Sequence, residues 1–503
     1  MKNVKSLIFI SFLTLLSFNI FSQKQEKIHL LNADYLKYDK LVNPNFQILS
    51  GNVSFKYEDA TLHCDSARLY INRDYIETYG NVHVIVNDSV QLWGDTLKID
   101  GNNDKATVIG NVKLIDNQIT LTGEQLFYNL KNDIAYYYSR SHIRDRENYL
   151  TSLIGFYYTQ EKNFFFKDSV FLQNENFDIY SDTMLYNTNT EITYFHGYSK
   201  IIGPENTLIC NFGRYDTKND IGNFSKDTKF IRGTSVLVSD SLMYNRNLAY
   251  GEVFKNIVFT DTAENIIVYG DYGKFFETDS SFFVTEKALM KIINETDTLH
   301  LHGDTLFVLT DTLHNQRIMK AYNSVKFFSF DFQGVCDSLV FLTKDSVMYF
   351  YYAPVIWTNS TQLIGDTIII TYLNGELNKV LLNNKAFIIS KENSEDYNQI
   401  KGDRIEADFK ENKIDILFAY DNAETLYYVF DDNNELIGIN KAKSDKIKIT
   451  FEDNTVQGIT LYSSPSGNLF PEKDIAENEK KLSGFKWLTG YRPLSPEDIF
   501  RRE

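Results

Sequence analysis

A short pattern of apolar and polar positions recurs along the chain: an aliphatic residue, any residue, a small residue and an acid. Leu62-His63-Cys64-Asp65 and Leu363-Ile364-Gly365-Asp366 are examples. The acidic column consists of Asp34, Asp65, Asp95, Glu124, Leu153, Asp182, Asn211, Asp240, Asp271, Asp304, Asp337, Asp366, Asp403 and Asp445, with Leu153 and Asn211 as exceptions. Its members are 29–31 residues apart as far as Asp271 and up to 42 apart later. A fixed period of this size predicts about fourteen structural repeats.

Two apolar columns flank the acid. The column three residues before it is mostly aliphatic and includes Leu62, Leu92, Leu121, Ile179, Leu208 and Leu237. The column four residues after it is often tyrosine and includes Tyr128, Tyr157, Tyr186, Tyr215 and Tyr244. A flat strand would point these two columns to opposite faces. Both face one interior if the chain bends beside the small residue, and we favour this over a strand that is apolar on both faces.

A second signal precedes the acid by about a dozen residues. It is clearest in Gly51-Asn52-Val53, Gly80-Asn81-Val82 and Gly110-Asn111-Val112, and it predicts a turn that feeds a new strand. Each repeat should then hold two or three strands. Because no segment before residue 465 shows sustained 3.6-residue periodicity, the pattern predicts an all-β chain.

The last residues differ from the repeats. Pro471 to Leu482 has the composition of a short polar helix, and Ser495-Pro496 has the residues that begin another. Apolar residues around Trp487 accompany them. We expect residues 462–503 to form a tail with short helices that caps the last repeat, with docking on a partner as the alternative.

The N-terminus predicts export. Lys2 and Lys5 precede an apolar run from Leu7 to Phe21, which is too short for a membrane span and typical of a signal peptide. We expect residues 1–22 to be cleaved after Ser22, with an uncleaved anchor helix as the alternative. Residues 23–461 then form the repeat domain. The expected location is the periplasm or cell envelope, and an association with the outer membrane stays open.

The amino-acid composition argues against nucleic-acid binding and agrees with a β-rich fold. The net charge of −16 argues against an extended nucleic-acid surface. The 33 Tyr and 38 Phe suit half-buried strands, and the seven Pro are few enough for continuous strand pairing.

Candidate reactive groups are sparse. Cys64, Cys210 and Cys336 all occupy the small column, so we interpret them as small packing residues rather than a disulfide framework. His300, His302 and His314 are a weak metal candidate, and we predict no metal or cofactor. A carboxylate in nearly every repeat is more typical of turn stabilisation than of catalysis or a calcium ladder, so no catalytic residue is predicted.

The alternation of "GNV" with "small-Asp-x-apolar-x-Tyr", as in Gly51-Asn52-Val53 followed by Cys64-Asp65 and Leu69-Tyr70, resembles the OstA-like family. This is the family of LptA-type proteins and LptD N-terminal domains in lipopolysaccharide transport, and the resemblance covers roughly residues 28–460. It implies an elongated, open, twisted β-jelly roll with acyl chains held between two sheets. It also implies lipopolysaccharide or lipid A as ligand, and other envelope transport proteins as partners through exposed edge strands near Ile28–Tyr38 and Lys446–Leu461.

Together these features predict a non-enzymatic lipid carrier that bridges the periplasm in lipopolysaccharide transport. The two apolar columns named above would line its groove. The alternative is a structural or adhesive β-solenoid with a solid core, since both predict the same apolar columns. A third possibility, a polysaccharide enzyme that uses the acidic column, needs an out-of-pattern repeat, and only the His300–His314 repeat offers one.

Overall fold

The computed structural model describes residues 28–501 apart from 58, 87–88, 117–118, 146–147, 295–296, 315, 394 and 432–434. The predicted signal peptide and its cleavage site lie outside the described residues. The chain divides into two compact units, residues 1–147 with 158–160 and residues 148–157 with 161–503. Both units consist of antiparallel strands, so the predicted all-β fold is confirmed.

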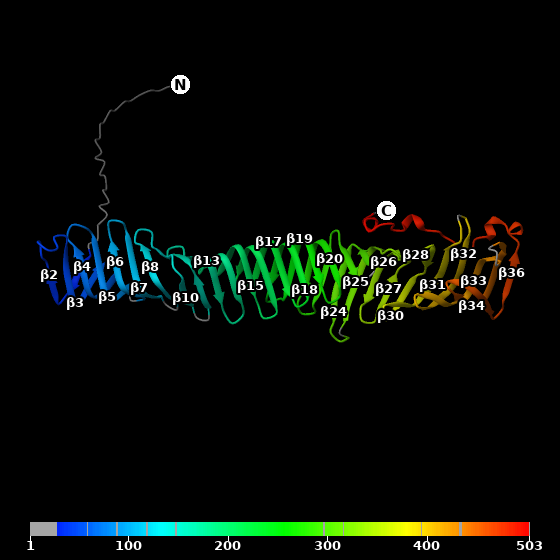
Figure 1. Ribbon diagram of the computed structural model, residues 1–503, viewed down its shortest axis with the longest axis horizontal. Helices are drawn as coiled ribbons and strands as arrows, with labels where there is room; N and C mark the ends of the chain where they lie inside the picture. The colour runs from blue at the N-terminus through cyan, green and yellow to red at the C-terminus, as the bar shows by residue number, and fades with distance from the viewer. Residues whose placement is uncertain are drawn as a thin grey trace, which may run out of the picture. The chain divides into compact units, whose positions relative to one another are not determined.

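The strands are labelled in Figure 1. Their bounds in the first unit are β1 His29–Asn32, β2 Tyr35–Lys37, β3 Phe46–Tyr57, β4 Ala60–Tyr70, β5 Tyr75–Val86, β6 Val90–Asp100, β7 Lys105–Asp116, β8 Ile119–Asn129, β9 Ile134–Tyr137 and β10 Ser141–Asp145. The next strands are β11 Asn148–Ser152, β12 Ile154–Tyr158, β13 Asn163–Gln173, β14 Asp178–Asn187, β15 Ile192–Ile202, β16 Asn206–Asp216, β17 Ile221–Arg232, β18 Ser235–Asn245, β19 Tyr250–Asp261, β20 Ile266–Phe276, β21 Ser281–Thr285, β22 Leu289–Ile293, β23 Thr298–His302 and β24 Thr305–Asp311. The last are β25 Gln316–Phe328, β26 Gln333–Leu342, β27 Val347–Tyr351, β28 Val355–Thr358, β29 Thr361–Ile364, β30 Thr367–Leu373, β31 Glu376–Lys391, β32 Tyr397–Lys410, β33 Lys413–Phe430, β34 Leu436–Glu452, β35 Thr455–Tyr462 and β36 Ser466–Phe470.

A regular repeat is two long strands. One carries the acidic column, as β16 and β18 do, and the other links it to the next repeat, as β17 and β19 do. Consecutive strands pair antiparallel from β13 through β20. Each added repeat therefore lengthens the second unit by two strands.

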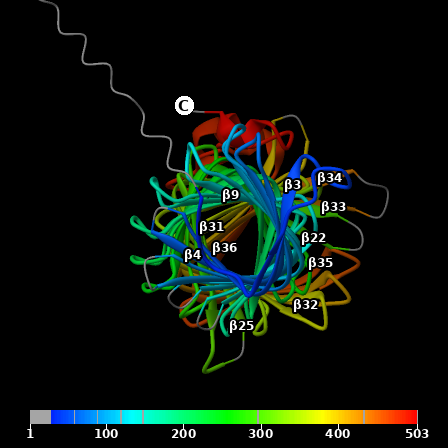
Figure 2. The same ribbon diagram turned by 90° about the vertical axis from the view of Figure 1, so that its left-hand side faces the viewer.

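Each long strand of a regular repeat bends near its middle. In β4, Leu62 and Cys64 before the acid and Ala67 after it are buried, while His63 and Asp65 are exposed. The buried positions thus change from even to odd numbering across the acid, which confirms the predicted bend. We call the part of each sheet that contains the column three before the acid half-sheet A, and the part that contains the column four after it half-sheet B. The bend can be followed in β3 and β4, the blue strands at the front of Figure 2.

The bend is made by a bulge in the linking strand. Gly51 and Asn52 have φ values of +80° and +46°, and the register shifts between Ser50 and Val53. Because Gly51-Asn52 lies inside β3, the prediction that this motif is a turn between two strands was wrong. Two successive left-handed residues insert extra length opposite one residue of the neighbouring strand, which bends the sheet without ending it.

The acidic column stabilises these bulges. Asn81 donates a hydrogen bond to the carboxylate of Asp65 (2.8 Å), and the same contact joins Asn111 with Asp95 (2.9 Å). Elsewhere the chemistry varies but the contact stays: Lys287 donates to Asp271 at 2.7 Å. These carboxylates were predicted to bind backbone groups of a turn, whereas at these repeats they bind a side chain of the bulge.

The tail does not form the two predicted helices. It contains three-residue 3-10 turns instead, which are η1 Glu472–Asp474, η2 Glu477–Glu479, η3 Thr489–Tyr491 and η4 Asp498–Phe500. The extended conformation of the tail places Ile475 and Leu482 on the outer surface of half-sheet A. Both side chains are buried there against Ile389, Leu426 and Ile439. The tail thus returns along the side of the second unit (Figure 1).

Three glutamine side chains form hydrogen bonds with the tail. Gln399 donates to the carbonyl of Lys480 and accepts from the amide of Leu482, both at 2.8 Å. Gln362 holds Lys486 and Leu488 in the same way, both at 2.7 Å. Such a pair of bonds to residues i and i+2 imitates a neighbouring β-strand. Gln333, one repeat earlier, accepts from the side chain of Arg492.

Candidate functional site

The candidate site is the apolar interior between half-sheets A and B. In the first unit a cluster of buried side chains lies in this interior. Leu62 is 5% exposed and belongs to a core cluster against which Leu92 and Leu121 pack. Tyr128 is half-buried, and its hydroxyl donates to Asp133 at 3.0 Å. The first-unit members of the predicted groove therefore face the interior.

The second unit contains a cavity of about 390 Å³ within its interior. Ile179 and Leu208 line it from half-sheet A, and Tyr215 and Tyr244 line it from half-sheet B. The cavity thus brings together four of the residues predicted to line the groove. Its volume lies in the range of small-molecule and cofactor pockets. Tyr157 and Tyr186 are half-buried on neighbouring strands and do not line it.

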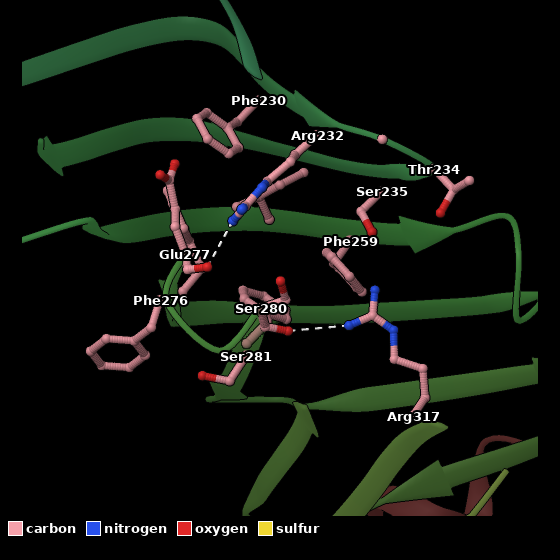
Figure 3. A pocket seen from close by; sticks show the side chains of 14 residues that line it. Phe230, Arg232, Thr234, Ser235, Phe259, Phe276, Glu277, Ser280, Ser281 and Arg317 are labelled. Atoms are coloured by element: carbon pink, nitrogen blue, oxygen red, sulfur yellow. Dashed lines mark hydrogen bonds between the residues drawn. The ribbon is translucent and has the colours of Figure 1, made fainter. Parts of the chain in front are cut away.

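A second cavity of about 270 Å³ lies next to the first, and Figure 3 shows its lining. Leu237 lines it, together with Phe259, Phe275 and Phe282. Phe230 and Glu277 border both cavities. The two spaces are therefore adjacent parts of one apolar interior.

The rings of Tyr215 and Tyr244 face the cavity, and their hydroxyls form hydrogen bonds at its rim. Tyr215 donates to Asp220 at 2.8 Å, and Tyr244 donates to Glu277 at 3.1 Å. Burial, followed by the nearby Glu277 carboxylate, raises the pKa of Tyr244 to about 12. Burial and the bond to Asp220 also raise the pKa of Tyr215. Both side chains stay neutral at physiological pH, as an apolar site requires.

The aromatic residues of the linking strands were missed by sequence reasoning. Phe195, Phe224, Phe230 and Phe259 all line the cavities. A signal exists, because they stand two residues before or four residues after the first residue of the bulge. Phe224 and Phe230, for example, flank the left-handed pair Lys226 and Asp227 in this way.

The mouth of the interior lies between the two rows of hairpin turns, opposite the bend, and polar contacts cross it. Arg317 of half-sheet B donates to the carboxylate of Asp261 of half-sheet A at 2.7 Å. Arg232 of half-sheet A donates to the backbone carbonyl of Glu277 of half-sheet B at 2.9 Å (Figure 3). Asn206 of half-sheet A also donates to the Glu277 carboxylate, at 3.1 Å.

The three cysteines are free and buried, in agreement with their interpretation as small packing residues. Burial raises the pKa of the Cys64 and Cys210 thiols to about 12, and it also raises that of Cys336. None of the three has the lowered pKa of a reactive thiolate.

The histidine candidates take separate partners. A ring nitrogen of His302 lies 2.6 Å from the carbonyl of Ala288, and one of His314 lies 2.6 Å from Asp311. Within the described residues, no group of three or more His, Cys, Asp or Glu side chains is arranged to hold a metal ion. The described residues also contain no helix that is long and apolar enough to cross a membrane.

Comparison with a family model confirms the resemblance over the first part of the repeats. Residues 25–182 match the model of the family described as OstA-like protein, so this part of the chain is similar to that family. No curated protein is significantly similar to the chain. One solved structure that matches is LptH from Pseudomonas aeruginosa, described as the LptA-homologous periplasmic component of the lipopolysaccharide transport device. It is 16% identical with a TM-score of 0.20, over 23% of this chain and 83% of LptH.

Proposed function

We propose that the protein is a non-enzymatic lipid carrier of the periplasm, which takes part in transporting lipopolysaccharide to the outer membrane. Acyl chains would lie between half-sheets A and B, against Leu62, Leu92, Leu121, Ile179, Leu208 and Leu237 and the tyrosines at positions 128, 157, 186, 215 and 244. The observation that carries the proposal is the pair of adjacent cavities, which Ile179, Leu208, Leu237, Tyr215 and Tyr244 line.

The OstA-like match supports a role of this type at the level of the family. The wall chemistry agrees with it, because an acyl chain needs a continuous apolar surface without unpaired polar groups. The tyrosine hydroxyls and the charged groups lie at the rim, where a ligand's polar head would remain in water.

The rival function, a structural solenoid with a solid core, also has an observation in its favour. Phe230 and Phe275, from opposite half-sheets, have ring centroids 4.9 Å apart, and so do Phe259 and Phe282. Both pairs line the smaller cavity, and they partly fill the interior there. A carrier requires their side chains to change rotamer as a chain passes, whereas a solid core requires them to stay.

Edge strands are the proposed contacts with other envelope transport proteins. β1 and β2 pair with β3, and their side chains Leu31, Tyr35 and Leu36 are more than half exposed. At the other end of the chain, β35 and β36 pair with β34. Such edges can accept a strand from another protein.

Photo-crosslinking in cells tests the carrier. A photoreactive residue at Leu208 or Leu237 lies on a cavity wall, while Lys218 and Asn219 are exposed on a hairpin and serve as controls. We expect lipopolysaccharide adducts at the two leucines and none at the controls. Absence of lipid adducts at both leucines in folded, exported protein would favour the solid core.

A further inference from the structure

Three contacts cross the mouth beside the two cavities. They join Asn206, Arg232 and Asp261 on half-sheet A to Glu277 and Arg317 on half-sheet B. Glu277 borders both cavities and receives two of these contacts. A ligand whose chains occupied both cavities would therefore lie under a closed mouth.

One side of the closure is fixed. Asp261 is 1% exposed, and besides Arg317 it accepts hydrogen bonds from Thr234, Ser235 and the amide of Ala263. Arg317 also donates to the carbonyl of Ser280 at 3.2 Å. Separating these groups would leave a buried charge without its partner, which is strongly unfavourable.

The other side is held loosely. Arg232 is about one third exposed, it meets Glu277 only through a backbone carbonyl, and its ion pair with the exposed Glu205 is solvated. Asn206 contributes a single hydrogen bond to Glu277. Each of these bonds exchanges readily with water, so their loss costs little.

The asymmetry has a consequence for an amphipathic ligand. We propose that Asn206, Arg232 and Glu277 form a lateral gate, which opens for a ligand whose bulky head group projects through the mouth and stays closed over a single chain with a small head. The Asp261–Arg317 ion pair stays formed beside the gate when the gate opens. This inference rests on the proposed lipid binding, and it makes head-group size the property that the mouth discriminates.

Stopped-flow binding to the purified full chain tests the gate with two probes, a fluorescent long-chain fatty acid and fluorescently labelled lipopolysaccharide. In the double variant N206A/R232M the gate contacts are absent and the Arg232 stem is largely kept. We expect association of the lipopolysaccharide probe to become about tenfold faster, because about two weak hydrogen bonds no longer have to break. The fatty acid should associate at an unchanged rate.

Two further variants sharpen the comparison. K229M alters the same strand on its outer face and should change neither rate. R232C/E277C, closed by a short bifunctional maleimide, locks the gate, and the native cysteines are too buried to react. The locked protein should retain the fatty acid and lose the lipopolysaccharide probe, with circular dichroism showing an intact β-fold.

Two results would overturn the gate while leaving lipid binding in place. One is a locked protein that binds the lipopolysaccharide probe as fast as the unlocked one. The other is N206A/R232M changing both probes equally or neither of them. If the unmodified protein binds neither probe, the proposed function fails and the gate fails with it.

Discussion

At the scale of single residues, many of the bulges contain one polar side-chain pair, and its two positions tolerate exchange. Asp240 accepts from Asn256 at 3.0 Å, whereas one repeat earlier Asn211 donates to Asp227 at 2.8 Å. The carboxylate thus changes strand while the contact stays. The sequence shows the acidic column clearly, but it hides the partner, because the partner is 16 to 19 residues away and varies between Asn, Asp and Lys.

The exchange predicts a charge-swap result. N256D should place two carboxylates together and lower the free energy of unfolding at neutral pH by about 1–2 kcal/mol. D240N/N256D should recover most of this loss, because it recreates the Asn211–Asp227 arrangement. Urea unfolding measures both, with N189D on an exposed hairpin as control. A double variant that is less stable than N256D would contradict the pairing.

Gly80 shows why some bulges need glycine. Its φ is +74°, and a Cβ there would lie 2.4 Å from Asp65 Oδ2. Gly375 has a similar φ of +83° with open space around it. We expect G80A to cost more stability than G375A, which should cost about 1 kcal/mol from backbone conformation alone. Thermal melting of the two variants compares them, and equal losses would show that the carboxylate simply moves away.

At the scale of elements, the period of the acid and the parity of its flanking columns predict the bent strands that carry it. The linking strands are harder to recognise. Their aromatic residues stand at fixed spacings from the bulge, and the bulge was interpreted as a turn. The tail was predicted from helix composition alone. Its conformation is decided instead by glutamines four residues before the acid at positions 337, 366 and 403, which local sequence cannot connect to a segment more than eighty residues later.

The glutamine contacts predict a local loss of protection in the tail. Gln362 is fully buried, and its Oε1 also accepts from the Trp357 indole at 3.1 Å. Q362A should leave that donor unpaired, cost about 1–3 kcal/mol, and speed hydrogen exchange at the amide of Leu488. The exposed Gln173 gives the control Q173A. Unchanged exchange at Leu488 would mean that the tail is held by its apolar side chains alone.

At the scale of the whole molecule, the repeat places the same apolar columns in the interior of both units. The first unit has a continuous core cluster, and the second unit contains two cavities that both border Phe230. A sequence column says which side chains face inward. It does not say whether they touch, because that depends on how far the two half-sheets separate and on which aromatic rings reach across.

The central claim is that this interior holds lipid, and lipid analysis of the protein purified from its native envelope tests it most directly. Mass spectrometry of the extracted material should find lipopolysaccharide bound to the unmodified chain. L208W/L237W, which fills both cavities, should bind at least several-fold less, while K229W on the outer face should bind as much as the unmodified chain. A folded, exported protein that carries no lipid, or equal lipid in all three forms, would contradict the carrier and leave a packed structural solenoid.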